Sequence, residues 1–168
     1  MKDFLGNNLE LRPVSPDYLK VNYINDAIGN IFFLGIPLVA AILVTCFSES
    51  LVWTIILWVV VALALIIAVI DFMLIARRVR ALGYAELPEE LAIRKGIMFQ
   101  KLVMVPYGRM QQVNVETGPI LSRYGLAKVK LVTASAGTNA EIPGLPLAEA
   151  ERLREKLTEL GRAHMEGL

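Results

Sequence analysis

The chain has 168 residues, of which 55% are hydrophobic and 20% are charged. This length fits one or two domains, and the mean hydropathy of +0.54 is high for a soluble globular protein. The formal net charge of +1 excludes the strong positive field of nucleic-acid-binding proteins, so we expect no nucleic-acid partner.

Residues 1–27 form a polar N-terminal segment with scattered apolar side chains. We predict an irregular arm that leads into the start of an interfacial helix. Asn22, Asn25 and Asp26 are suitable caps for that helix. Tyr18 stands where an amphipathic ring settles at the level of the lipid headgroups.

Two apolar runs follow at residues 28–47 and 51–76, separated by Ser48, Glu49 and Ser50. A helix needs about 20 mainly apolar residues to cross a bilayer, and each run reaches that length. The first run is a poor signal peptide, because a long segment with several acidic residues precedes it. The sequence therefore predicts two transmembrane helices joined by a tight turn.

The basic residues near these runs lie on one side of the predicted hairpin. They are Lys2, Arg12 and Lys20 before the first run, and Arg77, Arg78 and Arg80 after the second. By the positive-inside rule, we expect both termini in the cytoplasm and the hairpin in a bacterial inner membrane. The three arginines are candidate contacts with the membrane surface, because each cation near an anionic surface gains about 1 kcal/mol.

Asp71 is the one charged residue inside either run. An intramembrane acid is by default a functional-site hypothesis. It lies about two turns before Arg78, so we expect it to anchor the helix at the cytoplasmic interface. The alternative is a proton or ion site assisted by a kink at Pro37. Cys46, the one cysteine, is expected to be a buried apolar thiol.

After residue 81 the hydrophobic period changes to that of strands. Short apolar segments separated by turn residues predict strands at residues 83–87, 91–97 and 99–105. In residues 110–116, Gln111, Val113 and Val115 alternate with polar neighbours, which predicts a strand with one solvated face.

The remaining elements complete one small domain at residues 81–161. We predict a helical turn at 120–124, strands at 127–133 and 140–142 around a small-residue turn at 135–138, and a helix at 147–160. Leu147, Ala150, Leu153, Leu157 and Leu160 form the apolar stripe of that helix. The expected fold class is a membrane α-helical hairpin followed by a bent antiparallel sheet capped by a C-terminal helix, with a frayed tail at 162–168.

The side chains that most catalytic sites need are scarce. His164 is the single histidine, and with Cys46 inside a predicted span no zinc site or Cys/His nucleophile can be assembled. The chain also contains no GxxxxGK[ST] phosphate loop. We expect no metal, no cofactor and no enzymatic activity.

Several segments together resemble a known family. They are Ile93-Arg94-Lys95-Gly96, residues 105–113, Thr117-Gly118-Pro119-Ile120, Tyr124-Gly125-Leu126-Ala127 and Ile142-Pro143-Gly144-Leu145. Their order is similar to that of the bacterial pleckstrin-homology-like domain family of YdbS-like membrane proteins. Met110 stands where that family usually has isoleucine. The resemblance implies two transmembrane helices followed by a small α+β, mainly-β domain of the pleckstrin-homology (PH) type.

The resemblance also implies a function in binding. We expect an interaction or assembly module that works with a membrane-protein partner carrying related domains, or with further copies of itself. The alternative is a sensor of anionic phospholipid, with candidate ligand contacts at Arg94, Lys95, Lys101, Arg109, Lys128 and Lys130. We expect Arg109 to be structural. The acidic turn at residues 87–90, taken as the connection between the first two strands, disfavours an inositide ligand.

Overall fold

The computed structural model describes residues 10–47, 50–133 and 140–166. The chain divides into two compact units. One is a helical hairpin, Asn22–Ala76, and the other combines Met1–Val21 with Arg77–Leu168. The predicted small-residue turn at 135–138 lies outside the described residues.

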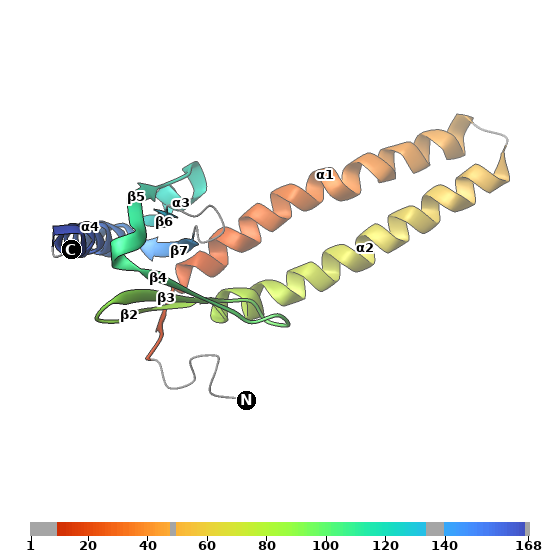
Figure 1. Cartoon of the computed structure of the whole chain (residues 1–168). Coiled ribbons are helices and arrows are strands. Elements are labelled where there is room, and N and C mark those ends of the chain that lie inside the picture. Colours follow the sequence, from red (N-terminus) through yellow and green to blue (C-terminus); the bar gives the residue numbers. More distant parts are fainter. Residues whose placement is uncertain (1–9, 48–49, 134–139, 167–168) are drawn as a thin grey trace. The chain divides into compact units, whose positions relative to one another are not determined.

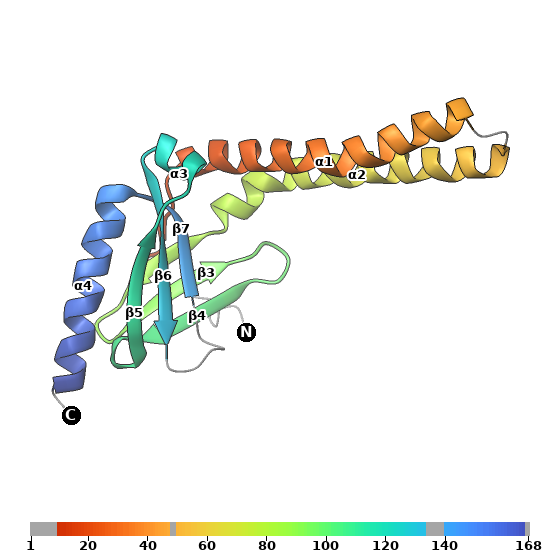
Figure 2. The same ribbon diagram turned by 90° about the horizontal axis from the view of Figure 1, so that it is seen from above.

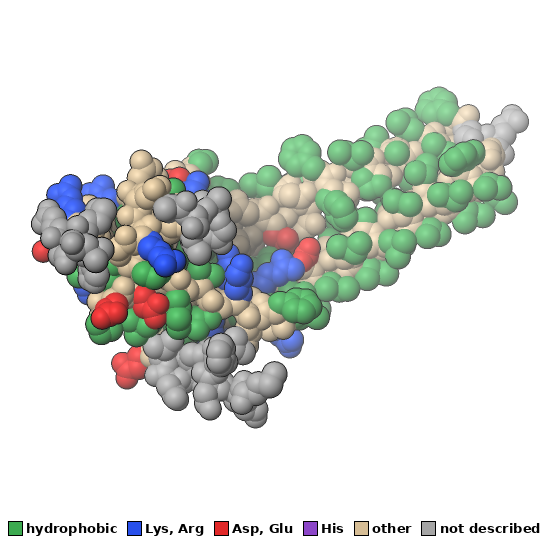
Figure 3. All heavy atoms as spheres, viewed as in Figure 1, with side chains coloured by type: hydrophobic (Ala, Val, Ile, Leu, Met, Phe, Trp, Pro, Cys, Tyr) green, Lys and Arg blue, Asp and Glu red, His purple; other side chains and the backbone are tan. Residues whose placement is uncertain are grey.

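Two long helices form the hairpin, α1 (Asp17–Phe47) and α2 (Leu51–Arg80) (Figure 1). Both are long and apolar enough to cross a membrane. Most of their large apolar side chains are exposed, and hydrophobic atoms cover the visible face of both helices (Figure 3). Cys46 is exposed on this outward apolar surface, and not buried as predicted. A helix pair with its apolar surface outward is suited to lipid.

Small side chains lie between the two helices. Ala41, Ala64 and Ala68 are buried, whereas most of the large apolar side chains of the two helices are exposed. Trp58 Nε1 donates a hydrogen bond of 3.3 Å to Thr45 Oγ1. At the other end of the hairpin, the rings of Tyr23 and Phe72 lie 4.9 Å apart.

Helix α1 begins earlier than the apolar run suggests. The predicted caps were Asn22, Asn25 and Asp26, but the helix starts at Asp17. The Asp17 N–H donates to Ser15 Oγ, and Pro16 directly precedes the helix, where its missing N–H costs nothing. Residues of the predicted irregular arm are therefore helical.

The second unit contains two antiparallel sheets (Figure 2). The first sheet has the order β1-β2-β3-β4: β1 (Arg12–Pro13), β2 (Gly83–Glu86), β3 (Glu90–Lys95) and β4 (Lys101–Pro106). A 3₁₀ turn, η2 (Tyr107–Arg109), leads to the second sheet, which has the order β5-β6-β7: β5 (Met110–Glu116), β6 (Leu126–Thr133) and β7 (Ala140–Pro146). Helix α3 (Pro119–Arg123) precedes β6, and α4 (Leu147–Glu166) is the last described element. The predicted PH-like layout is confirmed, with two sheets in place of one bent sheet.

A strand from before the hairpin completes the first sheet. Pro13 pairs with Gly83 and Arg12 with Tyr84, so β1 lies beside β2 although the whole hairpin separates them in sequence. Val14 and Val79 enter the same hydrophobic core from the two ends of the hairpin. The prediction that the acidic turn at 87–90 connects the first two strands is therefore wrong, since this turn connects β2 to β3. The membrane hairpin is the connection between the first two strands.

Helix α4 covers the core with Ala150, Leu153 and Leu157, as its stripe predicts. Leu147 is 44% exposed and does not join them, because it lies at the first helical position. The helix also continues to Glu166, through residues predicted to fray. Gly161 is buried, with the Tyr107 carbonyl 3.5 Å from where a Cβ would lie. An added Cβ would make only an ordinary van der Waals contact there, and Gly161 does not end the helix.

Candidate functional site

A groove of about 370 Å³ lies between β5 and α4. Its described lining residues are Met110, Gln111, Gln112, Val113, Asn114, Leu157, Thr158, Gly161 and Arg162. Met110 and Leu157 are buried and form an apolar floor. The amide and hydroxyl side chains are exposed or border the surface. The groove therefore combines an apolar floor with hydrogen-bonding walls, which suits binding of a ligand.

Strand β5 borders the groove with an open edge. It pairs with β6 on one side, and among the described strands none pairs with its other side. A register shift between Met110 and Gln112 marks a β-bulge at Gln111. The bulge exposes both Gln111 and Gln112, so Gln111 does not share the buried face of Val113 as the alternation predicted.

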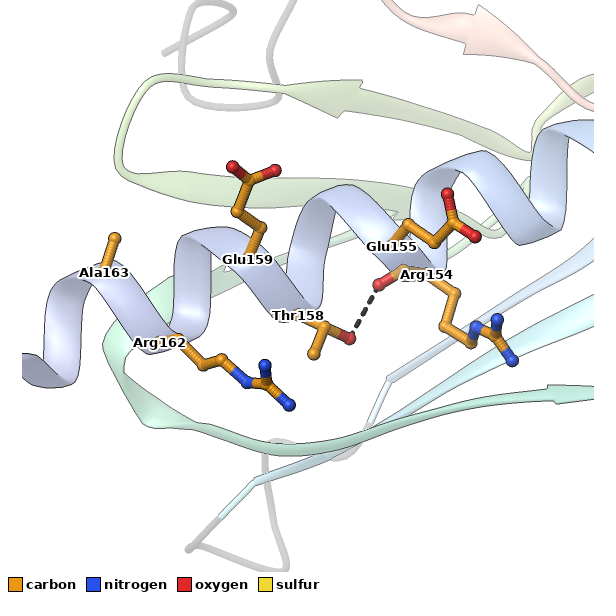
Figure 4. Close-up of a pocket in the computed structure, with 6 residues that line it drawn as sticks. All are labelled: Arg154, Glu155, Thr158, Glu159, Arg162 and Ala163. Atoms are coloured by element: carbon orange, nitrogen blue, oxygen red, sulfur yellow. Dashed lines mark hydrogen bonds between the residues drawn. The ribbon is translucent and has the colours of Figure 1, made fainter.

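The wall formed by α4 is cationic on one side. In Figure 4, Arg154, Thr158 and Arg162 point to one side of the helix, and Glu155 and Glu159 point to the other. These residues, with Ala163, line a neighbouring hollow of about 540 Å³ that shares Thr158 and Arg162 with the groove. Within the described part of the chain, Arg154 and Arg162 make no side-chain ion pair. Their charges remain available to an anionic ligand.

The opposite flank of α4 has a structural role. Arg152 Nη2 lies 2.5 Å from Glu86 Oε1 on β2 and 2.7 Å from Glu149 Oε1. Lys156 Nζ lies 2.6 Å from Glu86 Oε2, and the Tyr84 hydroxyl donates to Glu149. This network ties α4 to the first sheet, and it is distinct from the cationic side that borders the groove.

The charges in this network shift the pKa values of its members. Hydrogen bonds from Arg152 lower the pKa of Glu149 to about 2, despite its partial burial. Burial raises the pKa of Glu86, but hydrogen bonds from Arg152 and Lys156 outweigh it, so that pKa is lowered as well. Burial and the hydrogen bond to Glu149 raise the pKa of Tyr84 to about 12. The carboxylates are therefore held in their charged forms.

The structure separates the predicted ligand cations into groups. Lys128 Nζ lies 3.7 Å from both Glu116 and Glu141, and Lys130 Nζ lies 3.7 Å from Glu116. These two lysines are thus neutralised by neighbours on β5 and β7. Arg109 is exposed in η2, away from them. It does not pair with Glu116, whose partners are the lysines.

A second group of cations lies at one end of the first sheet. Lys95 and Lys101 are directly opposite each other where β3 turns into β4, and Arg94 pairs with Leu102 one position further in. On the other side of β3, Arg94 pairs with Gly83 of β2. Gly83 follows Arg80 by three residues in the sequence. The exposed Arg77, Arg78 and Arg80 lie on the last turn of α2, which is fixed to the domain because Val79 is buried in the core.

One predicted feature keeps its status as a hypothesis. Asp71 is half-buried in α2, and its role as an interfacial anchor or ion site stays a prediction. Within the described residues, no three His, Cys, Asp or Glu side chains gather as metal ligands. The groove was not predicted from the sequence, because an open strand edge depends on which strands pair. The two neighbouring amides Gln111 and Gln112 were the signal in the sequence that could have indicated a binding groove.

Comparison with known proteins links the whole arrangement to one family. A family model described as "Bacterial PH domain" matches residues 31–161. The UPF0699 transmembrane protein YdbS of Bacillus subtilis (strain 168) is 34% identical over 149 residues, covering 89% of this chain and 91% of that protein. No solved structure matches the chain. The matched region begins inside α1, so the similarity includes the hairpin as well as the sheets.

Proposed function

Because this chain belongs to the bacterial PH domain family of transmembrane proteins, we propose that it is a non-enzymatic adaptor held at the membrane. Its hairpin tethers the PH-like domain to the cytoplasmic face of the inner membrane, and its β5–α4 groove binds an extended segment of a membrane-protein partner. The distribution of Lys and Arg around the hairpin supports this orientation.

The open edge of β5 beside the groove is the observation that carries the proposal. An extended peptide can add to such an edge as a further strand, using main-chain hydrogen bonds for affinity and neighbouring pockets for selection. The groove supplies an apolar floor at Met110 and Leu157 for alternate side chains of the peptide. Without a bound peptide, the unpaired edge of β5 would be exposed to pairing with strands of other chains.

Charge selects the class of peptide. Arg154 and Arg162 lie two turns apart on the side of α4 that includes Thr158, and neither makes an ion pair among the described side chains. Arginine binds carboxylates in a bidentate geometry. The expected occupant is therefore an extended segment of a partner membrane protein that alternates apolar and acidic residues.

A photocrosslinking amino acid at Asn114 in native membranes tests this function. We expect a product with another membrane protein from Asn114, which lines the groove, and none from Glu155, which points to the other side of α4. Arg162→Glu is expected to reduce the yield about tenfold, equivalent to about 1.4 kcal/mol. A crosslinked product that contains only this chain would mean that the groove binds a second copy and not another membrane protein. Equal labelling from both positions, or none from either, would refute the groove.

A second candidate function is binding of anionic phospholipid. It is favoured by the cluster of Arg94, Lys95 and Lys101 at the end of the sheet next to the last turn of α2. Native mass spectrometry of the full chain should show preferential retention of phosphatidylglycerol over phosphatidylcholine. Changing the three cations to glutamine is expected to reduce that preference at least about tenfold. Lys128→Gln with Lys130→Gln is the control, since those lysines are already paired with carboxylates. An unchanged preference in the triple variant would rule this function out.

A further inference from the structure

Among the described residues of the domain, the turn between β3 and β4 exposes the most accessible large apolar side chains. Met98 is 87% exposed and Phe99 is 89% exposed, whereas the next most exposed, Met104 and Leu147, are less than half exposed. Methionine and phenylalanine are normally among the buried residues, so two fully exposed neighbours at a turn indicate a contact surface. Ile97 adjoins them and is half-buried.

Cations flank this apolar tip on both strands. Lys95 on β3 lies directly opposite Lys101 on β4, and both are exposed. Like charges directly opposite each other in a sheet are unfavourable. In the part of the chain that the structure describes, neither lysine nor Arg94 has an anionic side chain in an ion pair. An external anion would relieve the repulsion.

The register places the turn at the membrane-attached end of the sheet. Gly83, at the start of β2, pairs with Pro13 on one side and with Arg94 on the other. Pro13 leads into α1, and Gly83 follows directly after α2. The β3–β4 turn therefore leaves the sheet at the same end at which the chain goes to the hairpin and returns from it.

We propose that the tip formed by Ile97, Met98 and Phe99 inserts into the headgroup region of the bilayer that the hairpin spans. Apolar side chains in an interface gain from leaving water, and flanking lysines gain from anionic headgroups. The tip is then a third point of attachment beside α1 and α2. Three points of attachment restrict tilting of the domain relative to the membrane more than two adjacent helix ends do.

This orientation has a consequence for binding. With the tip in the lipid, the direction in which the β5–α4 groove faces is fixed relative to the membrane plane. The proposal itself depends on the hairpin spanning the bilayer and not on any occupant of the groove. Its test uses pure lipid, so its failure is distinguishable from failure of the partner-binding function.

The experiment uses the full chain reconstituted in vesicles of phosphatidylcholine and phosphatidylglycerol. Cys46 is replaced by serine, and an environment-sensitive fluorophore is attached at Met98→Cys or, as a matched exposed control, at Glu155→Cys. Lipids carrying a quencher just below the headgroups should quench the label at position 98 at least about twofold more than the label at 155. Lys95→Gln with Lys101→Gln should reduce the difference, as should vesicles without phosphatidylglycerol.

Equal quenching at the two positions would overturn the proposal. So would shielding of the position-98 label only in native membranes, because the tip would then contact a protein and not lipid. Met98→Ser with Phe99→Ser provides a second measurement. Since both side chains are exposed, this variant is expected to fold normally while its domain rotates more freely in fluorescence anisotropy. Unchanged anisotropy would also contradict insertion.

Discussion

Replacing Gly144 by alanine is expected to destabilise the PH-like domain by about 2–4 kcal/mol, combining left-handed backbone strain with overpacking. Gly144 lies in β7 with φ +72°, a conformation that costs other residues energy. An added Cβ would lie 2.6 Å from the Cβ and Cδ2 atoms of Tyr18 and closer still to its Cγ. Those atoms belong to the root of the tyrosine side chain, so α1 itself must move.

The same contact fixes the first turn of α1 to β7 within the domain. The Ser15 N–H donates to the Gly144 carbonyl at 2.9 Å, just before α1 begins. Gly144→Ala is therefore expected to release residues near Ser15 and Tyr18 as well as to lower stability. Hydrogen exchange of the full chain in detergent should show loss of protection in this segment and in β1, while the hairpin stays protected.

Two other glycines separate the causes. Gly125 has φ +63° but open space where an added Cβ would lie, so Gly125→Ala introduces backbone strain without a clash. Gly118 has φ −110° and open space, so Gly118→Ala should be nearly neutral. The expected order of destabilisation is Gly144, then Gly125, then Gly118. If Gly144→Ala is no worse than Gly125→Ala, the contact with Tyr18 does not anchor α1.

Replacing Arg152 by methionine is expected to lower the free energy of unfolding of the domain by about 1–3 kcal/mol, the cost of lost charged hydrogen bonds. Arg152 joins Glu86 on β2 with Glu149 on its own helix. The Glu86 side chain is only 9% exposed, so it would keep a largely buried charge, with Lys156 at 2.6 Å and Arg12 at 3.5 Å as its remaining partners. Methionine preserves the length and apolar packing of the side chain, so the loss reports the ion pairs.

Arg154→Met is the matched control, since Arg154 is two residues away on α4 and makes no ion pair among the described side chains. Thermal unfolding of the domain, followed by circular dichroism of the full chain in detergent, should shift by about 4–8 °C for each kcal/mol. Arg152→Lys should recover only part of the loss, because an ammonium cannot bind two carboxylates in the same planar geometry. A shift as large in Arg154→Met would mean that the network is not the cause.

Acid provides a second readout of the same network. The folded-state pKa of Glu149 is about 2, below its ordinary value of 4.5, so its contribution is fully present above pH 4.5. That contribution is lost as the pH falls from 4.5 toward 2, and the lowered pKa of Glu86 adds in the same direction. Arg152→Met removes the largest cause of the shift and should flatten the acid dependence in this window. An identical acid profile in the variant would exclude Arg152 as that cause.

Local patterns predicted most of the individual elements. Alternation and turn residues placed β2 through β4, β6 and the helical turn at α3, because each depends on neighbours in sequence. The apolar stripe identified the face of α4 that packs on the core. The bulge at Gln111 was missed, since an extra residue in a strand is defined by its partner on β6 and not by its own sequence.

The two runs of apolar residues determined by themselves that the chain carries a membrane hairpin. A helix makes its own backbone hydrogen bonds in lipid, so whether it can span depends on its length and composition, which the sequence shows. Only the tertiary structure decided that β1 comes from before the hairpin, that the hairpin connects the first two strands of a sheet, and that β5 presents an open edge beside α4. Each of these is a pairing between distant segments. Arg12–Pro13 is too short to show a strand period, and its sheet position exists only because Tyr84 and Gly83 offer it an edge.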